Sequence, residues 1–312
     1  SVVTRILLNQ GHQVRVLDSL LYGGKALLGL YPDQNFSFIR GDIREVEVVK
    51  RALDGSEAVV HLAAIVGDPA CARQATLARE INLDASLRLF DLCQHEGVKR
   101  FVFASTCSNY GKMADSSDYV SEDSELRPVS LYAESKVSVE KTLLSFPSRD
   151  GVLPVTTALR FATLFGLSPR MRFDLTVNEF TMELLTKRRL VVYGGQFWRP
   201  YIHVRDASRA IAMVLDAPPD VVRGQVFNVG ETSQNFQKSR LVELIRTQMD
   251  GQVKIEYVHK EEDPRDYRVS FEKVKRGLSF QVTRTVTDGI REIIDAIAQG
   301  VITDFDNPDY RN

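Results

Sequence analysis

Tyr132 and Lys136 have the residue types and the spacing that a proton-transfer catalyst needs. Residues four apart on a helix share one face, so both side chains would point into the same cleft. A phenol with its ordinary pKa of about 10 is a poor base at neutral pH. A neighbouring ammonium stabilises the phenolate and lowers the pKa of the phenol. The pair therefore suits removal of a proton from a substrate hydroxyl.

The same spacing also occurs between solvated residues on helix surfaces, so the surrounding sequence decides the interpretation. Thr106 precedes the pair and follows residues 100–104 (RFVFA), which form a predicted buried strand. Ligands of open α/β sheets gather at the carboxyl ends of such strands. A hydroxyl at that point can hydrogen-bond the substrate oxygen that Tyr132 deprotonates. We therefore predict Thr106, Tyr132 and Lys136 as the catalytic residues.

The elements that must carry these residues alternate between strand and helix. Nearly continuous apolar runs predict buried strands, and runs with helical periodicity predict the helices between them. This order is typical of a parallel sheet covered on both faces. We predict an α/β fold, a Rossmann-like doubly wound parallel sheet with a smaller C-terminal α+β substrate-binding domain. The predicted strands are residues 36–39, 58–62, 100–104, 155–161 and 225–229, and the predicted helices are residues 46–53, 71–96, 206–216, 239–249 and 285–298, with another starting near Tyr132.

The amino-terminal residues have the order of a dinucleotide-binding unit. Residues 1–10 (SVVTRILLNQ) have the apolar spacing of a helix that Gly11 ends, and the alternation around Val14 and Val16 predicts a short strand. In such a unit a strand and a glycine-rich turn precede this helix, and an acid ending the second strand binds the adenosine ribose. We expect that first strand and glycine loop to lie before this segment. Asp18 takes the place of the ribose-binding acid, or alternatively only ends its strand.

The composition disfavours several classes of function. The chain has 312 residues, 44% of them hydrophobic, and its 40 basic and 41 acidic residues nearly cancel. No run of like charge indicates binding to nucleic acid or to an anionic membrane, and no stretch approaches the roughly 20 apolar residues of a membrane-spanning helix. The three cysteines and five histidines lack the spacing of disulfide frameworks and metal ligands. We expect a cytoplasmic protein without a metal.

The segment around Thr106 also carries a family resemblance. Thr106 stands four residues before Tyr110-Gly111, and the Tyr-x-x-x-Lys pair follows, a pattern that resembles the extended short-chain dehydrogenases/reductases. The resemblance covers nearly the whole chain and implies NAD as the cofactor. The cofactor-binding residues that it implies, together with the ribose-binding acid, are Asp18, Asp42, Ile43, Leu62, Ala63, Ala64, Asn82, Tyr132, Lys136 and Phe161.

The second half of the chain is similar to the nucleotide-sugar branch of that family. Arg199 matches a phosphate-binding arginine of the branch, Arg265 matches a later one, and Arg170 and Arg172 are further candidates. Two guanidinium groups suit a diphosphate because each offers a rigid fork of donors to phosphate oxygens. The implied substrate is a nucleotide-diphosphate sugar, and its implied binding residues are Thr106, Ser108, Asn178, Arg199 and Arg265.

The resemblance also predicts how the chain is divided. Residues 1–166 are the predicted NAD-binding Rossmann domain, and residues 167–312 are mainly the predicted nucleotide-sugar-binding domain. Residues 200–222 are expected to return to the Rossmann core. Family resemblance further implies a homodimer, and neither a nucleic acid nor a membrane is expected as a partner.

Two positions depart from the patterns of related enzymes. Sugar 4,6-dehydratases of this type carry Asp-Glu directly after the threonine, because elimination of water needs an added acid and base. Cys107 and Ser108 occupy those positions here. Epimerases that invert carbons next to the keto group carry a cysteine where this chain has Ser108. Dehydration and C3/C5 inversion are therefore disfavoured, and we expect His203 to pack or hydrogen-bond within its strand rather than pair with Cys107.

The remaining reaction is reversible oxidation of a sugar carbinol, with C4 as the expected carbon. We predict a C4 epimerase that works through a 4-keto sugar and returns the hydride to the opposite face. The alternative is a C4 dehydrogenase or ketosugar reductase that uses the same residues and releases its product. A non-catalytic NAD or nucleotide-sugar binding protein is a third alternative, which the complete catalytic set disfavours.

We expect the full-length protein to bind NAD more tightly than NADP. Asp18 can accept hydrogen bonds from both ribose hydroxyls of NAD but repels the extra phosphate of NADP, and the neutral Ser19 offers no compensating charge. Titration with each cofactor measures the ratio of the two dissociation constants. Equal or tighter binding of NADP would remove Asp18 from the predicted site.

Overall fold

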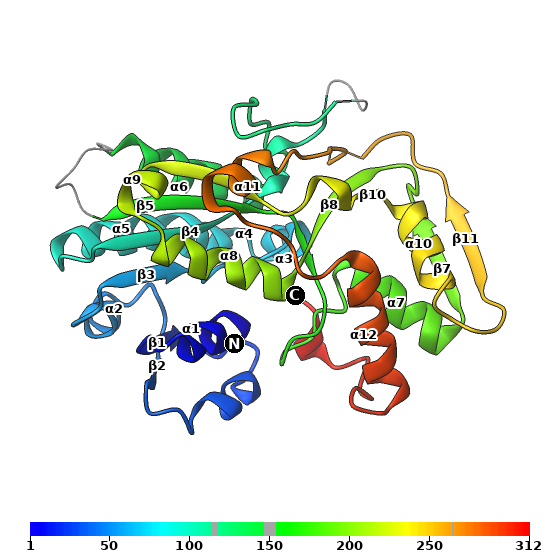
Figure 1. Cartoon of the computed structure of the whole chain (residues 1–312), viewed down its shortest axis with the longest axis horizontal. Helices are drawn as coiled ribbons and strands as arrows, with labels where there is room; N and C mark the ends of the chain where they lie inside the picture. Colours follow the sequence, from blue (N-terminus) through cyan, green and yellow to red (C-terminus); the bar gives the residue numbers. More distant parts are fainter. Residues whose placement is uncertain (114–117, 147–153, 264) are drawn as a thin grey trace.

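The computed structural model describes residues 1–113, 118–146, 154–263 and 265–312 (Figure 1). The predicted strands and helices of the first half are present, most within one or two residues of the expected bounds. They are α1 (Val2–Asn9), β1 (Val14–Asp18), β2 (Phe36–Arg40), α2 (Val46–Leu53), β3 (Ala58–His61), β4 (Arg100–Thr106), α6 (Leu131–Ser145) and β5 (Val155–Phe161). The strand predicted at residues 225–229 is present as β9 (Gln225–Val229).

These strands pair in parallel. Strands β3, β4, β5 and β9 form one sheet in the order β3-β4-β5-β9, and β1 and β2 form a separate parallel pair. Within the larger sheet, Thr106 at the end of β4 lies opposite Phe161 at the end of β5. The α/β fold with a parallel sheet is thus confirmed, and the end of β4 lies at the carboxyl edge of that sheet.

Helices cover both faces of the larger sheet. Phe101 and Phe103 pack on one face against α6 and α5 (Ser86–His95), whereas Val102 packs on the other face against α1 and α8 (Val204–Asp216). Alternate residues of a strand point to opposite faces, so a nearly continuous apolar strand is needed when both faces are buried. The apolar sequence of β4 therefore follows from its central place between two helical layers.

The prediction of one long helix over residues 71–96 was wrong in detail. The segment is divided into α3 (Asp68–Arg73), α4 (Ala75–Arg79), a π-helical turn (Glu80–Ala85) and α5. Gln74 leaves the helical region of backbone dihedral angles, with φ −128° and ψ 50°, and separates α3 from α4. In the π-helical turn, the side chain of Asn82 hydrogen-bonds the main chain of Ile65. Local periodicity cannot reveal such a tertiary contact.

The second half contains several elements that the sequence pattern did not predict. Strands β6 (Thr163–Phe165), β8 (Trp198–His203) and β10 (Asn235–Gln237) form one sheet, and β7 (Arg189–Tyr193) pairs with β11 (Lys254–Val258). Helices α8, α10 (Lys238–Arg246) and α12 (Val286–Ala298) match predicted helices, whereas α7 (Thr176–Lys187), α9 (Pro219–Val222) and α11 (Glu272–Leu278) were not predicted. Helices α7, α10 and α12 gather on the right of Figure 1 beside β7 and β11.

The division of the chain into domains stays a prediction. The packing of α8 concerns the segment expected to return to the Rossmann core. Helix α8, within the segment expected to return to the first half, contacts α1, β4 and β5. Strand β9 then joins the larger sheet beside β5. Of the described helices, none combines the length and the apolar character required to cross a membrane.

A buried ion pair joins α6 to the sheet. Glu140 of α6 and Arg160 of β5 are 1% and 4% exposed, and the guanidinium donates to both carboxylate oxygens. Ser105 of β4 donates to the same carboxylate at 2.6 Å. Arg160 also donates to the hydroxyl of Tyr110 at 2.8 Å, and that hydroxyl donates to Asn228 of β9 at 2.6 Å. One network therefore fixes α6 against three neighbouring strands.

Replacing Glu140 by Gln should lower the free energy of unfolding by about 3 kcal/mol, because Arg160 would keep a buried charge without its partner. The double variant E140Q/R160M removes the charge as well and should recover most of the loss. Urea denaturation of the wild type and both variants measures these differences. A double variant no more stable than the single one would show that the ion pair is not the source of the effect.

Candidate active site

The turn that follows β4 fixes Thr106 at the carboxyl end of that strand. The residue ends β4, and its hydroxyl accepts a hydrogen bond from the main-chain nitrogen of Ser108 at 3.1 Å. This bond caps the short 3-10 helix Cys107–Tyr110, so the chain turns away immediately after the strand. Thr106 is 9% exposed, and its side chain is close enough to Tyr132 to lower the pKa of that phenol.

Helix α6 presents Tyr132 and Lys136 beside this threonine. The helix begins at Leu131 because the hydroxyl of Ser130 caps it by accepting from the main-chain nitrogen of Ala133. Lys136 is 2% exposed and donates to the main-chain oxygen of Ala104 at 2.8 Å. Its ammonium also lies 4.7 Å from the centre of the Phe103 ring. The sequence-predicted catalytic residues therefore lie together at the end of β4.

The electrostatics differ from the expectation that Lys136 lowers the pKa of Tyr132. Burial raises the pKa of the Tyr132 phenol, and the nearby Cys71 and Asp68 raise it further. The opposing influences are the positive charge of Arg172 and the hydrogen bond with Thr106. Burial also lowers the pKa of Lys136 to about 8. The chain on its own therefore holds Tyr132 as a neutral phenol, because desolvation disfavours every charged form.

The residues predicted for the adenosine end lie at the ends of β1 and β2. Asp18 is exposed, and one of its oxygens accepts from the main-chain nitrogen of Leu20 at 2.7 Å. Asp42 instead receives two bonds from the guanidinium of Arg44, which lowers the pKa of Asp42. Ile43 is partly buried against the core. Asp42 is thus occupied by Arg44, whereas Asp18 remains accessible.

The residues predicted for the other end of the cofactor follow β3 and β5. Leu62 is 43% exposed, and Ala63 and Ala64 are partly buried in the loop after β3. Asn82 is 1% exposed and uses its amide to bind the nitrogen and the oxygen of Ile65, both at 2.8 Å. Phe161 is partly buried at the end of β5. Asn82 therefore shapes the loop after β3.

These residues fit NAD in chemical type. Asp18 offers an accessible carboxylate to ribose hydroxyls, and the small side chains of Ala63 and Ala64 follow the carboxyl end of β3. Lys136 offers ammonium donors from a buried position next to Thr106.

The two predicted phosphate-binding arginines converge on one acid that the sequence reasoning missed. Arg199 is 7% exposed and donates to Asp263 at 2.8 Å. Arg265 lies 3.8 Å from the other carboxylate oxygen of Asp263. Lys238 lies 3.6 Å from the oxygen that Arg199 contacts. Burial alone would raise the pKa of Asp263, but the three cations and a main-chain bond lower it. Arg199, Arg265 and Lys238 outnumber the two carboxylates that they contact, Asp263 and Asp68, so the cluster favours an added anion.

Asp68 is a second acid that sequence reasoning missed. It accepts from Arg265 at 2.8 Å and from the hydroxyl of Ser130 at 2.7 Å. Ser130 caps the helix that carries Tyr132, so Asp68 connects the arginine cluster to the catalytic helix. Only the three-dimensional contact identifies it, because Asp68 and Arg265 lie far apart in the sequence.

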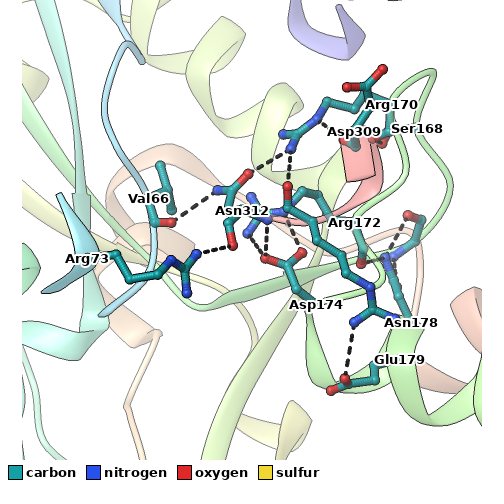
Figure 2. Close-up of polar contacts among 12 residues, drawn as sticks. Val66, Arg73, Ser168, Arg170, Arg172, Asp174, Asn178, Glu179, Asp309 and Asn312 are labelled. Atoms are coloured by element: carbon teal, nitrogen blue, oxygen red, sulfur yellow. Dashed lines mark hydrogen bonds and ion pairs between the residues drawn. The ribbon is translucent and has the colours of Figure 1, made fainter. Parts of the chain in front are cut away.

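Arg170 and Arg172 lie in the loop between β6 and α7, and Asn178 of α7 contacts that loop (Figure 2). Asn178 is 1% exposed and binds the main chain of Gly166 and Arg172 through its side-chain amide. Arg172 pairs with Asp174 through two bonds of 2.7 and 2.8 Å. Asn178 therefore shapes this loop, and Arg172 is the candidate arginine whose charge reaches Tyr132.

The side chains of Cys107, Ser108 and His203 each contact another part of the chain. Cys107 is 1% exposed and donates to the main-chain oxygen of Arg160, and burial raises the pKa of its thiol. The hydroxyl of Ser108 lies 3.4 Å from that of Tyr267. His203 accepts from the main-chain nitrogen of Arg205 and contacts Glu292 at 2.6 Å through its other ring nitrogen. The partner of His203 is therefore Glu292, which comes from α12.

A groove of about 570 Å³ lies beside the arginine cluster. It runs between α7 and β7, and Lys238 contributes to both the groove and the cluster around Asp263. Its lining residues are Thr176, Glu179, Phe180, Glu183, Lys187, Arg189, Leu190, Val191, Tyr193 and Lys238.

A Rossmann-like α/β fold with Thr106, Tyr132 and Lys136 at one strand end defines an extended short-chain dehydrogenase/reductase. The model of the NAD dependent epimerase/dehydratase family matches residues 1–230. The chain therefore belongs to the NAD-dependent epimerase/dehydratase family of enzymes, whose cofactor is NAD.

Named relatives carry more than one activity. The chain is 28% identical over 277 residues to the Bacillus subtilis (strain 168) protein named "Uncharacterized UDP-glucose epimerase YtcB", covering 85% of this chain and 82% of that protein. It is 27% identical over 293 residues to a dTDP-glucose 4,6-dehydratase of Streptomyces niveus, covering 92% and 84%. The structure of MoeE5 in complex with UDP-glucuronic acid and NAD has a TM-score of 0.82 and 26% identity, covering 96% and 95%.

Lys136 should make stability depend on pH. Its pKa falls from 10.5 to about 8 on folding, so the folded state binds fewer protons between these values and stability rises with pH there. Relative to Lys136→Met, the wild type should gain up to about 3 kcal/mol between pH 8 and 10.5. Urea denaturation of both proteins across this range tests the effect. Parallel curves would mean that the ammonium keeps its ordinary pKa.

Proposed function

We propose that this enzyme is a nucleotide-sugar 4-epimerase that works through a 4-keto intermediate. The observation that carries the proposal is the convergence of Thr106, Tyr132 and Lys136 at the carboxyl end of β4. This set can take a proton from a carbinol and return it, which is the proton chemistry of both half-reactions. NAD, when bound, supplies the acceptor and the donor of the hydride.

Each catalytic residue has a distinct role in this proposal. Tyr132 removes the proton of the C4 hydroxyl, and Thr106 hydrogen-bonds the same oxygen and the phenol. Burial of both groups makes the hydrogen bond stronger than it would be in water. Lys136 holds the ribose next to the nicotinamide, and its positive charge favours the phenolate once the site is complete.

The arginine cluster supports a nucleotide diphosphate as the recognised part of the substrate. Arg199 and Arg265 present guanidinium forks, and Lys238 adds a third cation within reach of the same carboxylate. A diphosphate carries enough negative charge to bind all three. Relatives are named for UDP-glucose and dTDP-glucose, so a pyrimidine nucleotide sugar is the substrate class that we propose.

Dehydration is less well supported, although several relatives carry that name. The two positions where related dehydratases carry an acid and a base hold Cys107 and Ser108 here. The Cys107 thiol is buried, has a raised pKa and donates to a main-chain oxygen. Neither side chain is therefore suited to proton transfer at neutral pH.

A C4 dehydrogenase or ketosugar reductase is the second candidate. It would use the same Thr106, Tyr132 and Lys136 but would exchange its cofactor after each turnover. The epimerase is preferred because these three residues suffice for both half-reactions without a second substrate. Assembly as a homodimer remains an expectation from the family resemblance, and a cytoplasmic location remains an expectation from the composition.

The fate of the hydride separates the two candidates. UDP-glucose and UDP-glucuronic acid are each incubated with the full-length enzyme and substoichiometric NAD. A 4-epimerase should give the 4-epimer, identified by NMR, over many turnovers and without lasting absorbance of reduced nicotinamide. Stoichiometric reduction of NAD with accumulating ketosugar would overturn the epimerase proposal and favour the dehydrogenase.

A further inference from the structure

Residues 308–312 lie across two loops of the candidate site. The first, here called the β3 loop, comprises residues 62–67 and contains Ala63 and Ala64. The second, called the β6 loop, comprises residues 166–175 and precedes α7. If the proposed function holds, the β3 loop faces the cofactor and the β6 loop faces the sugar nucleotide.

Each loop is shaped by an asparagine from a neighbouring element. Asn82 binds the nitrogen and the oxygen of Ile65 within the β3 loop. Asn178 binds the nitrogen of Gly166 and the oxygen of Arg172 within the β6 loop. These contacts fix the shape of each loop separately, and neither sets the distance between them.

Asn312 contacts both loops, and all four of its polar groups have partners (Figure 2). Its side-chain nitrogen donates to the oxygen of Val66 in the β3 loop at 3.0 Å. Its side-chain oxygen accepts from Arg170 in the β6 loop at 2.7 Å. Its main-chain nitrogen donates to Asp174 at 3.1 Å, and its main-chain oxygen accepts from Arg73 at 3.0 Å. An amide in this position ties the two loops together.

The preceding residues anchor Asn312 against the β6 loop. Arg170 donates to the main-chain oxygen of Asp309 at 2.6 Å, and the nitrogen of Phe173 donates to the oxygen of Tyr310 at 2.9 Å. The rings of Phe173 and Tyr310 pack edge to face with centres 5.8 Å apart. The segment therefore docks on one loop and extends Asn312 to the other.

We propose that Asn312 is a positioning residue that sets the distance between the β3 loop and the β6 loop. What the two loops bind rests on the proposed function, whereas the link between them does not. Transfer between two bound reactants needs an approach of about 3 to 3.5 Å, so a small change in the distance between the loops lowers the rate more than it lowers binding. The carboxylate of Asp174 also pairs with Arg172, so the same contact steadies the arginine whose charge acts on Tyr132.

The test compares Asn312→Ala with Asn307→Ala, which removes a side-chain cap in the same segment. Hydrogen–deuterium exchange is measured for the β3 and β6 loops, and turnover of a nucleotide sugar is measured in parallel. We expect exchange in both loops to accelerate about tenfold in N312A, because hydrogen bonds to both loops are lost. In N307A both loops should keep the wild-type rates. N312D keeps the acceptor for Arg170 and loses the donor to Val66, so only the β3 loop should exchange faster.

Activity provides the second criterion. N312A should lose about tenfold in kcat, with KM for the sugar nucleotide changed less than about twofold. Unchanged exchange in both loops would overturn the link, and faster exchange with unchanged kcat would overturn the positioning role. If the wild type oxidises no nucleotide sugar, the proposed function fails, and the exchange measurements still decide whether Asn312 joins the loops.

Discussion

The carboxylate of Glu140 is the contact on which the candidate site depends. It lies inside the protein, one turn beyond Lys136 on the same helix, and joins that helix to Ser105 and Arg160. Ser105 is the neighbour of Thr106, so the predicted catalytic hydroxyl and the helix that carries Tyr132 and Lys136 share one anchor. Because the ion pair is buried, it favours one position of α6 against the sheet: any shift would leave a charge unpaired in a low-dielectric interior. The network therefore fixes the relative position of Thr106, Tyr132 and Lys136 before any ligand binds.

The rest of the site is organised by acids that hold basic side chains in place. Asp263 gathers Arg199 and Lys238, Asp68 holds Arg265 against the cap of α6, and Asp174 holds Arg172. These pairs place the cations in advance, which reduces the conformational entropy lost when an anion binds. Tyr132, by contrast, has a raised pKa in the chain alone, so its reactivity depends on positive charge that arrives when the site is complete.

The sequence predicted the parts of the fold that local periodicity determines. The apolar runs of β4 and β5 had to be buried strands, and α2 followed directly from its periodic pattern. The grouping of Thr106, Tyr132 and Lys136 followed from where parallel strands end. The short strands β6 and β10 have three residues each and gave no periodic signal. Asp68 and Asp263 could not be found either, because Arg265, which Asp68 binds, and Arg199, which Asp263 binds, are distant from them in the sequence.

The most direct test of the account is the rate at which bound NAD is reduced by a nucleotide sugar in a single turnover of Tyr132→Phe. The variant keeps the ring and loses only the hydroxyl that the account uses as the base. We predict a rate at least about 10²-fold below that of the wild type, with the dissociation constant of the nucleotide sugar changed less than about twofold. A variant that retained the wild-type rate within a factor of about two would contradict the assignment of Tyr132, and with it the mechanism.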